Sequence, residues 1–218
     1  MTLAHLSSDM SPGLPEGIVH ELIAAGRRLE ARGMAAATSG NYSARLPDGR
    51  LALTVSGSHK GRLGPSDLMP VSATGESLDG RRPSAETLLH TGLYQLYPQV
   101  QAILHAHSVI SVTLTRLQPV KDSLSLEGYE MLKAFPGITT HETRVDIPIF
   151  DNAQDITRLS AVVSERLRAL PAPPPAYLLR GHGIYAWGTS VAEAERVMEA
   201  MEHLLACELE TLKLKTGA

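Results

Sequence analysis

The sequence predicts a three-layer α/β/α fold, in which helices pack on both faces of one sheet. Amphipathic helical segments and short apolar strand-like segments are mixed along the chain, which is typical of layered α/β domains. The 218 residues suit one large domain, and a hydrophobic content of 43% supplies its core. No repeat or long linker divides the chain. We therefore expect one domain over residues 16–218, preceded by a flexible segment, residues 1–15.

Helices are expected where apolar residues recur every three or four positions. The first expected helix, residues 16–32, ends at Gly33, a residue typical of helix ends. The last begins after Ser190 and carries a long stripe of Val, Met and Leu, which we expect to lie in the core or at a subunit interface. The other helices are expected over residues 84–96, after Ser108 and over residues 153–170.

Strands are expected in short apolar segments bounded by turn residues. The first two expected strands are joined by the turn Pro47-Asp-Gly49. A third is a continuous apolar run that ends in a pair of histidines, and the last two are separated by the glycines around His182. The expected strands are residues 41–45, 51–55, 100–106, 145–150, 177–179 and 183–187.

Composition excludes several classes of protein. The net charge is −3 and no run of Lys or Arg occurs, so nucleic acid and anionic membranes are not expected partners. No stretch of 18 apolar residues predicts a membrane span. Cys207 is the single cysteine, so no intrachain disulfide forms. Residues 1–15 lack the basic and apolar regions of a secretory signal, and we expect a cytoplasmic protein.

The strongest candidate for a functional site is the segment Leu104-His105-Ala106-His107-Ser108. Residues two apart on a strand point to the same face, so the two imidazoles emerge side by side at the end of the third strand. Buried histidines without a metal would each need a hydrogen-bond partner. The pair alone is compatible with either a metal site or an ordinary surface pair.

A third imidazole is expected from Arg180-Gly181-His182-Gly183. The flanking glycines permit positive φ and a close approach of the backbone, so a turn can direct His182. Together, His105, His107 and His182 provide three nitrogen ligands, and three histidines leave Zn²⁺ an open position for substrate.

Three loops have the composition of anion-binding sites. Pro83 and Ser84 suit a helix start, with Ser84 as N-cap and Glu86 in the first turn. Asn41 follows a serine and a glycine, and Ser56, Gly57 and Lys60 belong to a glycine-bounded loop whose N–H groups could hold a phosphate. Glu86 is a candidate metal ligand or acid/base group, or simply a favourable charge at the helix start.

These motifs, in this order, resemble the class II aldolase/epimerase family of zinc lyases. The matching elements are SGN, SGxxKG, PSxE, HxHS and the RGHG histidine, and the resemblance runs from about residue 18 to residue 212. It implies a three-layer α/β/α domain with a mostly antiparallel sheet, one Zn²⁺ per subunit on the three histidines, and a homotetramer. It also implies a small phosphorylated ketose as substrate, with its phosphate held by Asn41, Ser56, Gly57, Lys60 and Ser84.

The resemblance further assigns an acid/base residue. Glu130-Met-Leu-Lys133 resembles the Glu-Met-(Ile/Leu)-Lys segment of the family's dehydratases, whose glutamate moves the protons. It implies that Glu130 removes a proton beside the ketose carbonyl and assists the departure of water. Two alternatives remain: a sugar-phosphate aldolase or epimerase on the same scaffold, and a non-catalytic zinc-stabilised interaction domain.

One departure from the family leaves the role of Glu86 open. The family's aldolases have a second serine after Pro-Ser, where this chain has Ala85, and use the following glutamate as a fourth ligand. One phosphate-binding hydroxyl is therefore missing. Glu86 is retained, as a candidate fourth ligand or acid/base group.

Overall fold

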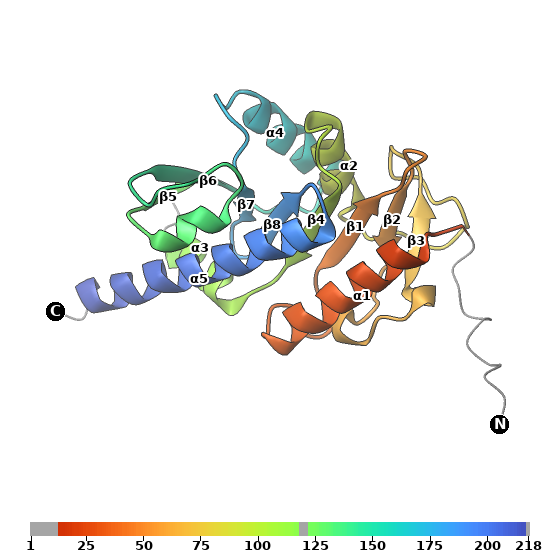
Figure 1. Ribbon diagram of the computed structural model, residues 1–218, viewed down its shortest axis with the longest axis horizontal. Helices are drawn as coiled ribbons and strands as arrows, with labels where there is room; N and C mark the ends of the chain where they lie inside the picture. The colour runs from red at the N-terminus through yellow and green to blue at the C-terminus, as the bar shows by residue number, and fades with distance from the viewer. Residues whose placement is uncertain (1–12, 118–121, 217–218) are drawn as a thin grey trace.

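The computed structural model describes residues 13–117 and 122–216, which form a mixed sheet between two layers of helices (Figure 1). Within these ranges the sheet has eight strands in the order β3-β2-β1-β4-β8-β7-β6-β5. All neighbouring strands are antiparallel except β6 and β7. The strands are β1 Asn41–Arg45, β2 Leu51–Thr54, β3 Leu68–Val71, β4 Ala102–Ala106, β5 Ser123–Glu127, β6 Arg144–Phe150, β7 Ala176–Leu179 and β8 Gly183–Gly188.

The helices are divided between the two faces of the sheet. Figure 1 shows α1 and α5 crossing one face, and α3 packs against α5 on that side. On the other face α2 packs against α4. The helices are α1 Glu16–Ala31, α2 Thr87–Leu96, α3 Val109–Leu117, α4 Ile156–Arg168 and α5 Val191–Thr216, with short 3₁₀ helices η1 Lys60–Arg62, η2 Pro65–Asp67 and η3 Glu130–Ala134. The predicted three-layer class with a mostly antiparallel sheet is confirmed.

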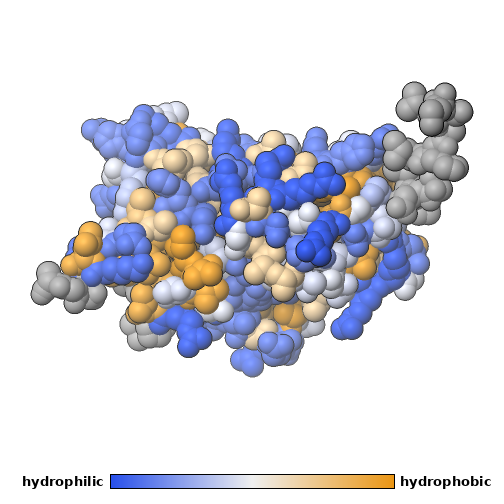
Figure 2. Space-filling model, turned by 90° about the horizontal axis from the view of Figure 1, so that it is seen from below, coloured by the Kyte–Doolittle hydropathy of each residue, from blue (hydrophilic) through white to orange (hydrophobic). Residues whose placement is uncertain are grey.

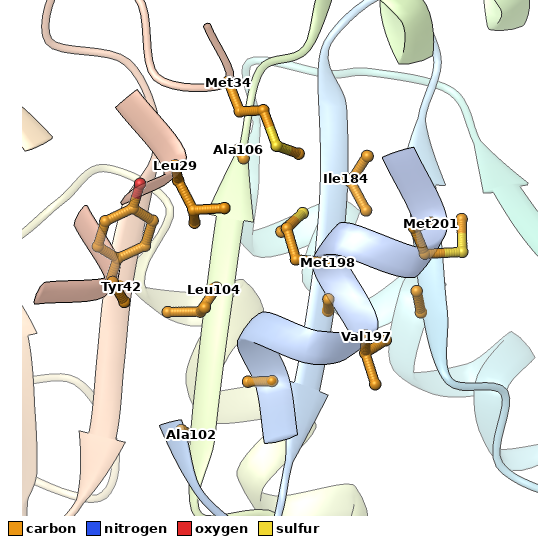
Figure 3. Close-up of a cluster of buried hydrophobic side chains, with 14 of the residues drawn as sticks. Leu29, Met34, Tyr42, Ala102, Leu104, Ala106, Ile184, Val197, Met198 and Met201 are labelled. Carbon is orange, nitrogen blue, oxygen red and sulfur yellow. The ribbon is translucent and has the colours of Figure 1, made fainter. Parts of the chain in front are cut away.

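Two hydrophobic clusters hold the layers together, one on each face. Along β4, Leu104 packs into the cluster beneath α1 and α5, whereas Ile103 packs into the cluster beneath α2 and α4. This is the alternation expected of a strand buried on both faces. In Figure 3 Leu29 of α1 lies beside Tyr42 and Leu104, and Met198 of α5 lies between Leu104 and Ile184 of the sheet. The apolar stripe of α5 is therefore core, as one of the two expectations stated.

Both edge strands were missing from the sequence prediction. β3 contains Pro70, and β5 alternates buried Leu with exposed or half-buried polar residues. The apolar run of β3 is only four residues long and contains a proline, and β5 has no continuous apolar run. Proline is tolerated in a sheet mainly at an edge, which is where β3 lies.

The start of α2 was also predicted incorrectly. The helix begins at Thr87 with Glu86 as N-cap, so Ser84 is not the cap. A bridge between Val55 and Pro83 holds this segment against the end of β2. The chain makes a turn, with the Thr87 N–H donating to the Ser84 carbonyl, before the helix starts.

The remaining expectations concern the chain ends and membranes. Most of the predicted flexible segment 1–15 lies outside the described residues, but Leu14 is buried in the cluster beneath α1 and α5. The domain limits 16–218 remain a prediction. Within residues 13–117 and 122–216, none of the helices is both long and apolar enough to cross a membrane.

Candidate active site

The histidine pair lies where β4 leaves the sheet, between two glycines of other strands. A Cβ atom on Gly40 would lie 2.4 Å from the His105 carbonyl oxygen, and one on Gly183 would lie 2.2 Å from the Ala106 carbonyl oxygen. Gly40 also has a φ of +77°, which favours glycine. The glycines of the SGN and RGHG motifs thus allow β1 and β8 to approach β4 closely at this point.

Four side chains converge here. Glu86, His105, His107 and His182 each offer one ligand atom, and these atoms all lie within 4.8 Å of one another. The Nε2 atoms of His105 and His107 are 2.8 Å apart. Glu86 Oε1 lies 2.9 Å from His182 Nε2, and its Oε2 lies 3.3 Å from His105 Nε2. The structure therefore brings together the three predicted histidines and the candidate fourth ligand.

In two of the imidazoles, Nδ1 carries the hydrogen and Nε2 therefore has a free lone pair. His105 Nδ1 is 2.9 Å from the Ile184 carbonyl, which can only accept, so Nδ1 carries the hydrogen. By the same argument His182 Nδ1 donates to Asn152 Oδ1 at 3.2 Å. The Nε2 lone pairs then face another imidazole and a carboxylate, an arrangement that a cation between them would satisfy. Metal-binding histidines commonly donate their outer N–H in this way.

The spacing and chemistry of the donors fit one metal ion. Ligands bound tetrahedrally at about 2.0–2.2 Å from zinc lie about 3.3–3.6 Å from one another. Three donor contacts measure 2.8 to 3.3 Å, and all four donors lie within 4.8 Å of one another, so these spacings lie on both sides of that range. The cluster could therefore hold a metal ion. Imidazole and carboxylate donors suit several divalent transition metals, so the donor types do not identify which one.

Two of the histidines are also kept in the neutral form that binds metals. Burial lowers the pKa of His107 to about 4 and that of His105 well below its usual value. Burial alone would raise the pKa of Glu86, but its contacts with His105 and His182 and the hydrogen bond from Asn41 outweigh burial and lower that pKa. The site thus combines the neutral imidazoles of His105 and His107 with an ionised carboxylate.

Two residues that orient the histidines were missed by the sequence analysis. Tyr185 stacks on the His105 ring, with centroids 4.0 Å apart and planes 13° from parallel. Asn152 follows β6 and accepts from His182. Tyr185 was recognisable only as part of an apolar strand, and Asn152 only as a polar residue after one. Their roles depend on strand pairing that periodicity does not give.

A cavity of about 420 Å³ opens beside the donor cluster, a size typical of small-molecule sites. It contacts Glu86, His107 and His182. The structure also brings the whole predicted phosphate set to its wall: Asn41, Ser56, Gly57, Lys60 and Ser84. Gly57 has a φ of +82°, consistent with a tight loop that exposes N–H groups.

Two of these residues already have structural contacts. Lys60 Nζ donates to the carbonyls of Thr38 and Ser58, at 2.9 and 2.6 Å, and so joins two pocket loops. Burial lowers the pKa of Lys60 to about 8. Asn41 Nδ2 donates to Glu86 Oε2 at 2.6 Å. Asn41 therefore supports the metal-site carboxylate, a contact that the sequence analysis did not anticipate.

Glu130 is not brought to this pocket within the chain. It lies at the start of η3 with its side chain 70% exposed, and it pairs with Lys133 and with His141 at 3.2 Å. It lines a separate surface hollow together with Tyr129, Met131 and His203. The hydrogen bond from Lys133 holds the pKa of Glu130 below its usual value, so it is a carboxylate at neutral pH.

A larger cavity, of about 530 Å³, lies away from this chemistry. It is lined by the proline-rich segment 171–175 and by residues before β4 and after β8. Those strand ends are opposite to the ends that carry His105 and Gly183. Its wall contains no histidine, lysine or cysteine, and its two carboxylates, Asp146 and Glu193, already pair with Arg144 and Arg196.

The comparisons with known families and proteins agree with this geometry. The Class II Aldolase and Adducin N-terminal domain family matches residues 20–209. The chain is 56% identical to methylthioribulose-1-phosphate dehydratase of Methylococcus capsulatus over 191 residues, 88% of this chain and 91% of the relative. It is 52% identical to the protein of the same name from Pseudomonas paraeruginosa, over 91% of this chain and 97% of that one.

A solved structure shares the same arrangement of elements. L-fuculose-1-phosphate aldolase of Thermus thermophilus superimposes with a TM-score of 0.74 at 28% identity. The superposition covers 92% of this chain and 96% of the aldolase. The likeness therefore extends through most of the layered domain.

Proposed function

Because this chain belongs to the Class II Aldolase and Adducin N-terminal domain family, we propose that it is a lyase that dehydrates methylthioribulose 1-phosphate. The product would be 2,3-diketo-5-methylthiopentyl 1-phosphate, an intermediate of methionine salvage formed in the cytoplasm. The observation that carries the proposal is the convergence of three imidazoles and a carboxylate beside a pocket whose loops have the composition of phosphate-binding loops.

We propose that the metal is zinc, held by His105, His107 and His182. When bound there, zinc supplies a Lewis acid that polarises the ketose oxygens and acidifies the neighbouring C–H bond. Ile184 and Asn152 orient two of the imidazoles through their outer nitrogens. Asn41 holds the Glu86 carboxylate beside them, so Glu86 is placed either to bind the metal or to exchange a proton with substrate.

The phosphate end of the substrate would be held by the loops after β2 and before α2. Ser56 and Ser84 offer hydroxyls, and Gly57 offers a backbone N–H in a tight turn. Lys60 contributes positive charge to the same wall, although two of its N–H bonds are used by carbonyls. An anion bound there would reinforce the protonated form of Lys60 against the effect of burial.

We propose that Glu130 moves the proton from C3 to the departing C4 hydroxyl. Removal of the C3 proton and the C4 hydroxyl leaves an enol, which becomes the 2,3-diketone by gaining a proton at C4. Because Glu130 lies outside the pocket of its own chain, we infer that it acts on the pocket of a neighbouring copy in a homotetramer. Glu130 is exposed, so a neighbouring copy can approach it, and it is ionised, so it can accept a proton.

The surface near α3 and α5 supports assembly. Val109 and Leu117 of α3 are 76% and 59% exposed, and Leu214 near the end of α5 is 77% exposed. Figure 2 shows apolar residues gathered toward the end of the molecule where the C-terminal helix finishes, on a face that is otherwise largely polar. We infer that this apolar end of the molecule contacts a neighbouring copy.

The direct test is to supply purified protein with methylthioribulose 1-phosphate and follow the phosphorus NMR spectrum. We expect one new phosphorylated product in the zinc-loaded protein and none after removal of the metal by chelator. The His107→Ala variant is the matched inactive control. A non-catalytic interaction domain would form no product in either state, and an aldolase would form dihydroxyacetone phosphate.

A further inference from the structure

The strand order arranges the pocket residues along one edge of the sheet. Ser56 follows β2, Asn41 begins β1, His107 follows β4, and His182 lies in the turn between β7 and β8. The segment 152–156 follows β6. Since these strands are neighbours in the order β2-β1-β4-β8-β7-β6, the pocket runs from the serine loop, past the donor cluster, to the start of α4.

The two ends of this pocket differ in charge. The end formed by the loop after β2 carries the Lys60 ammonium. At the other end the wall is formed by Asn152, Ala153, Gln154 and Ile156, none of which is charged. The one aspartate in this segment, Asp155, accepts from the Arg158 N–H as the N-cap of α4, and Asp151 just before it accepts from Arg180 Nε at 2.7 Å.

The uncharged end also has a fixed apolar surface. Ala153 and Ile156 are half-buried and pack against the hydrophobic cluster beneath α2 and α4. The Asp155 cap sets the start of the helix between them. Their positions therefore follow from the core of the protein and not from a free loop. The other apolar residues of the pocket wall, Val55 and Ala85, belong to the end that carries the serines.

We propose that Ala153 and Ile156 form the subsite that receives the methylthio end of the substrate and determines specificity for it. This inference rests on the proposed dehydratase function. The substrate carries its charge on C1 and an uncharged thioether on C5, with the reacting ketose carbons between them. The pocket has the same order: cation and hydroxyls, metal donors, aliphatic wall. A thioether gains from burial against aliphatic side chains, whereas a C5 hydroxyl would lose its hydration there.

Two ligands that differ only at C5 test the subsite. Methylthioribulose 1-phosphate serves as substrate, and ribulose 1-phosphate, with a hydroxyl at C5, serves as competitive inhibitor. In Ile156→Asn we expect kcat/KM for the methylthio substrate to fall about tenfold or more, since loss of an apolar contact typically costs this much discrimination. The inhibition constant of ribulose 1-phosphate should change less than about threefold, because its phosphate and ketose contacts remain.

Two further variants keep the test decisive. Val162→Asn changes a 48% exposed residue of the same helix that does not line the pocket, and should leave both constants unchanged. Ala153→Leu narrows the same wall, and should also weaken the methylthio substrate selectively, so it carries the test if Ile156→Asn does not fold. Unchanged discrimination in both folded wall variants, or an equal loss for the two ligands, would overturn the subsite. A wild-type protein that does not dehydrate methylthioribulose 1-phosphate would instead overturn the proposed function.

Discussion

The ring of Tyr185 lies nearly parallel to the ring of His105, with centroids 4.0 Å apart. Tyr177 in turn stacks on the ring of Tyr185, with centroids 4.7 Å apart, and both tyrosines are fully buried. His105 is thus held at its edge by the Ile184 carbonyl and at its face by an aromatic ring. This stack connects the first predicted metal ligand to the core beneath α2 and α4.

Removal of the Tyr185 ring should therefore affect both stability and metal binding. We expect Tyr185→Ala to lower the free energy of unfolding by about 3–5 kcal/mol, the usual cost of an aromatic cavity, and to weaken zinc retention. Tyr185→Phe keeps the ring and removes only its buried hydroxyl. It should change stability by less than about 1 kcal/mol. Urea unfolding and metal analysis check both; a larger effect in Tyr185→Phe would mean that the hydroxyl, not the stack, supports the site.

The three histidines should each be required for metal binding. We expect His105→Ala, His107→Ala and His182→Ala to lose most of their zinc on dialysis against chelator, because each leaves only two nitrogen ligands. Mass spectrometric metal analysis measures the occupancy. His20→Ala, whose side chain is 63% exposed on α1, is the matched control and should retain zinc like the wild type. Full occupancy in one of the three variants would remove that histidine from the ligand set.

Glu130 should affect turnover without affecting the metal. We expect Glu130→Gln to lower kcat by ~10²–10⁴ with zinc retained, because it keeps the size of the side chain but loses the base. Glu142→Gln, an exposed glutamate in the same region, is the control. If Glu130 acts between subunits, co-expression of Glu130→Gln with His107→Ala should restore part of the activity that each variant lacks. Absence of any recovery in mixed tetramers would contradict action between subunits, and wild-type turnover in Glu130→Gln would transfer the role to Glu86.

A buried histidine outside the donor set should make stability depend on pH. His90 is fully buried, its Nδ1 is 2.7 Å from Ser43 Oγ, and burial lowers its pKa to about 4, against a small opposing effect of Glu86. The unfolded chain, in which the pKa of His90 is near 6.5, binds the proton more strongly than the folded protein. The free energy of unfolding therefore decreases as the pH falls from about 6.5 to about 4. At pH 5 the loss should be about 2 kcal/mol.

The metal-free protein provides the measurement for His90. Urea unfolding at pH 7.5 and pH 5 should show a smaller loss of stability in His90→Asn than in the wild type, by about this amount. The donor histidines titrate in both proteins, so their contribution cancels in the difference. An identical pH dependence in the two proteins would show that His90 is not kept neutral by burial.

The predictable parts of the fold were those with strong local patterns. The apolar run of β4 placed the histidine pair at a strand end, and the glycines around His182 marked the turn that meets it. The edge strands lack such a pattern, because β3 is short and contains Pro70, whereas β5 has only one apolar face. Likewise, α2 starts later than predicted because Pro83 is bridged to Val55. The helix-capping preference of Ser84 could not indicate this long-range contact.

The site was predictable as a set of residue types but not as a set of contacts. Local motifs indicated the four residues whose ligand atoms cluster and the five predicted phosphate-binding residues of the pocket wall, but not the pocket segment 152–156. They did not indicate that Asn41 binds Glu86, that Lys60 joins two loops, or that Tyr185 stacks on His105. Each of these contacts joins segments far apart in the sequence through strand pairing. The hollow around Glu130 likewise depends on η3 packing against α5.

The most direct test of the account is the fate of the C3 hydrogen. Methylthioribulose 1-phosphate deuterated at C3 should give one phosphorylated product that retains every carbon and is lighter than the substrate by one molecule of HDO. Loss of the deuterium together with the C4 hydroxyl is the outcome that dehydration requires. Mass spectrometry that instead found dihydroxyacetone phosphate and a methylthio aldehyde would show cleavage of C3–C4, and would contradict the dehydratase function while leaving the metal site in place.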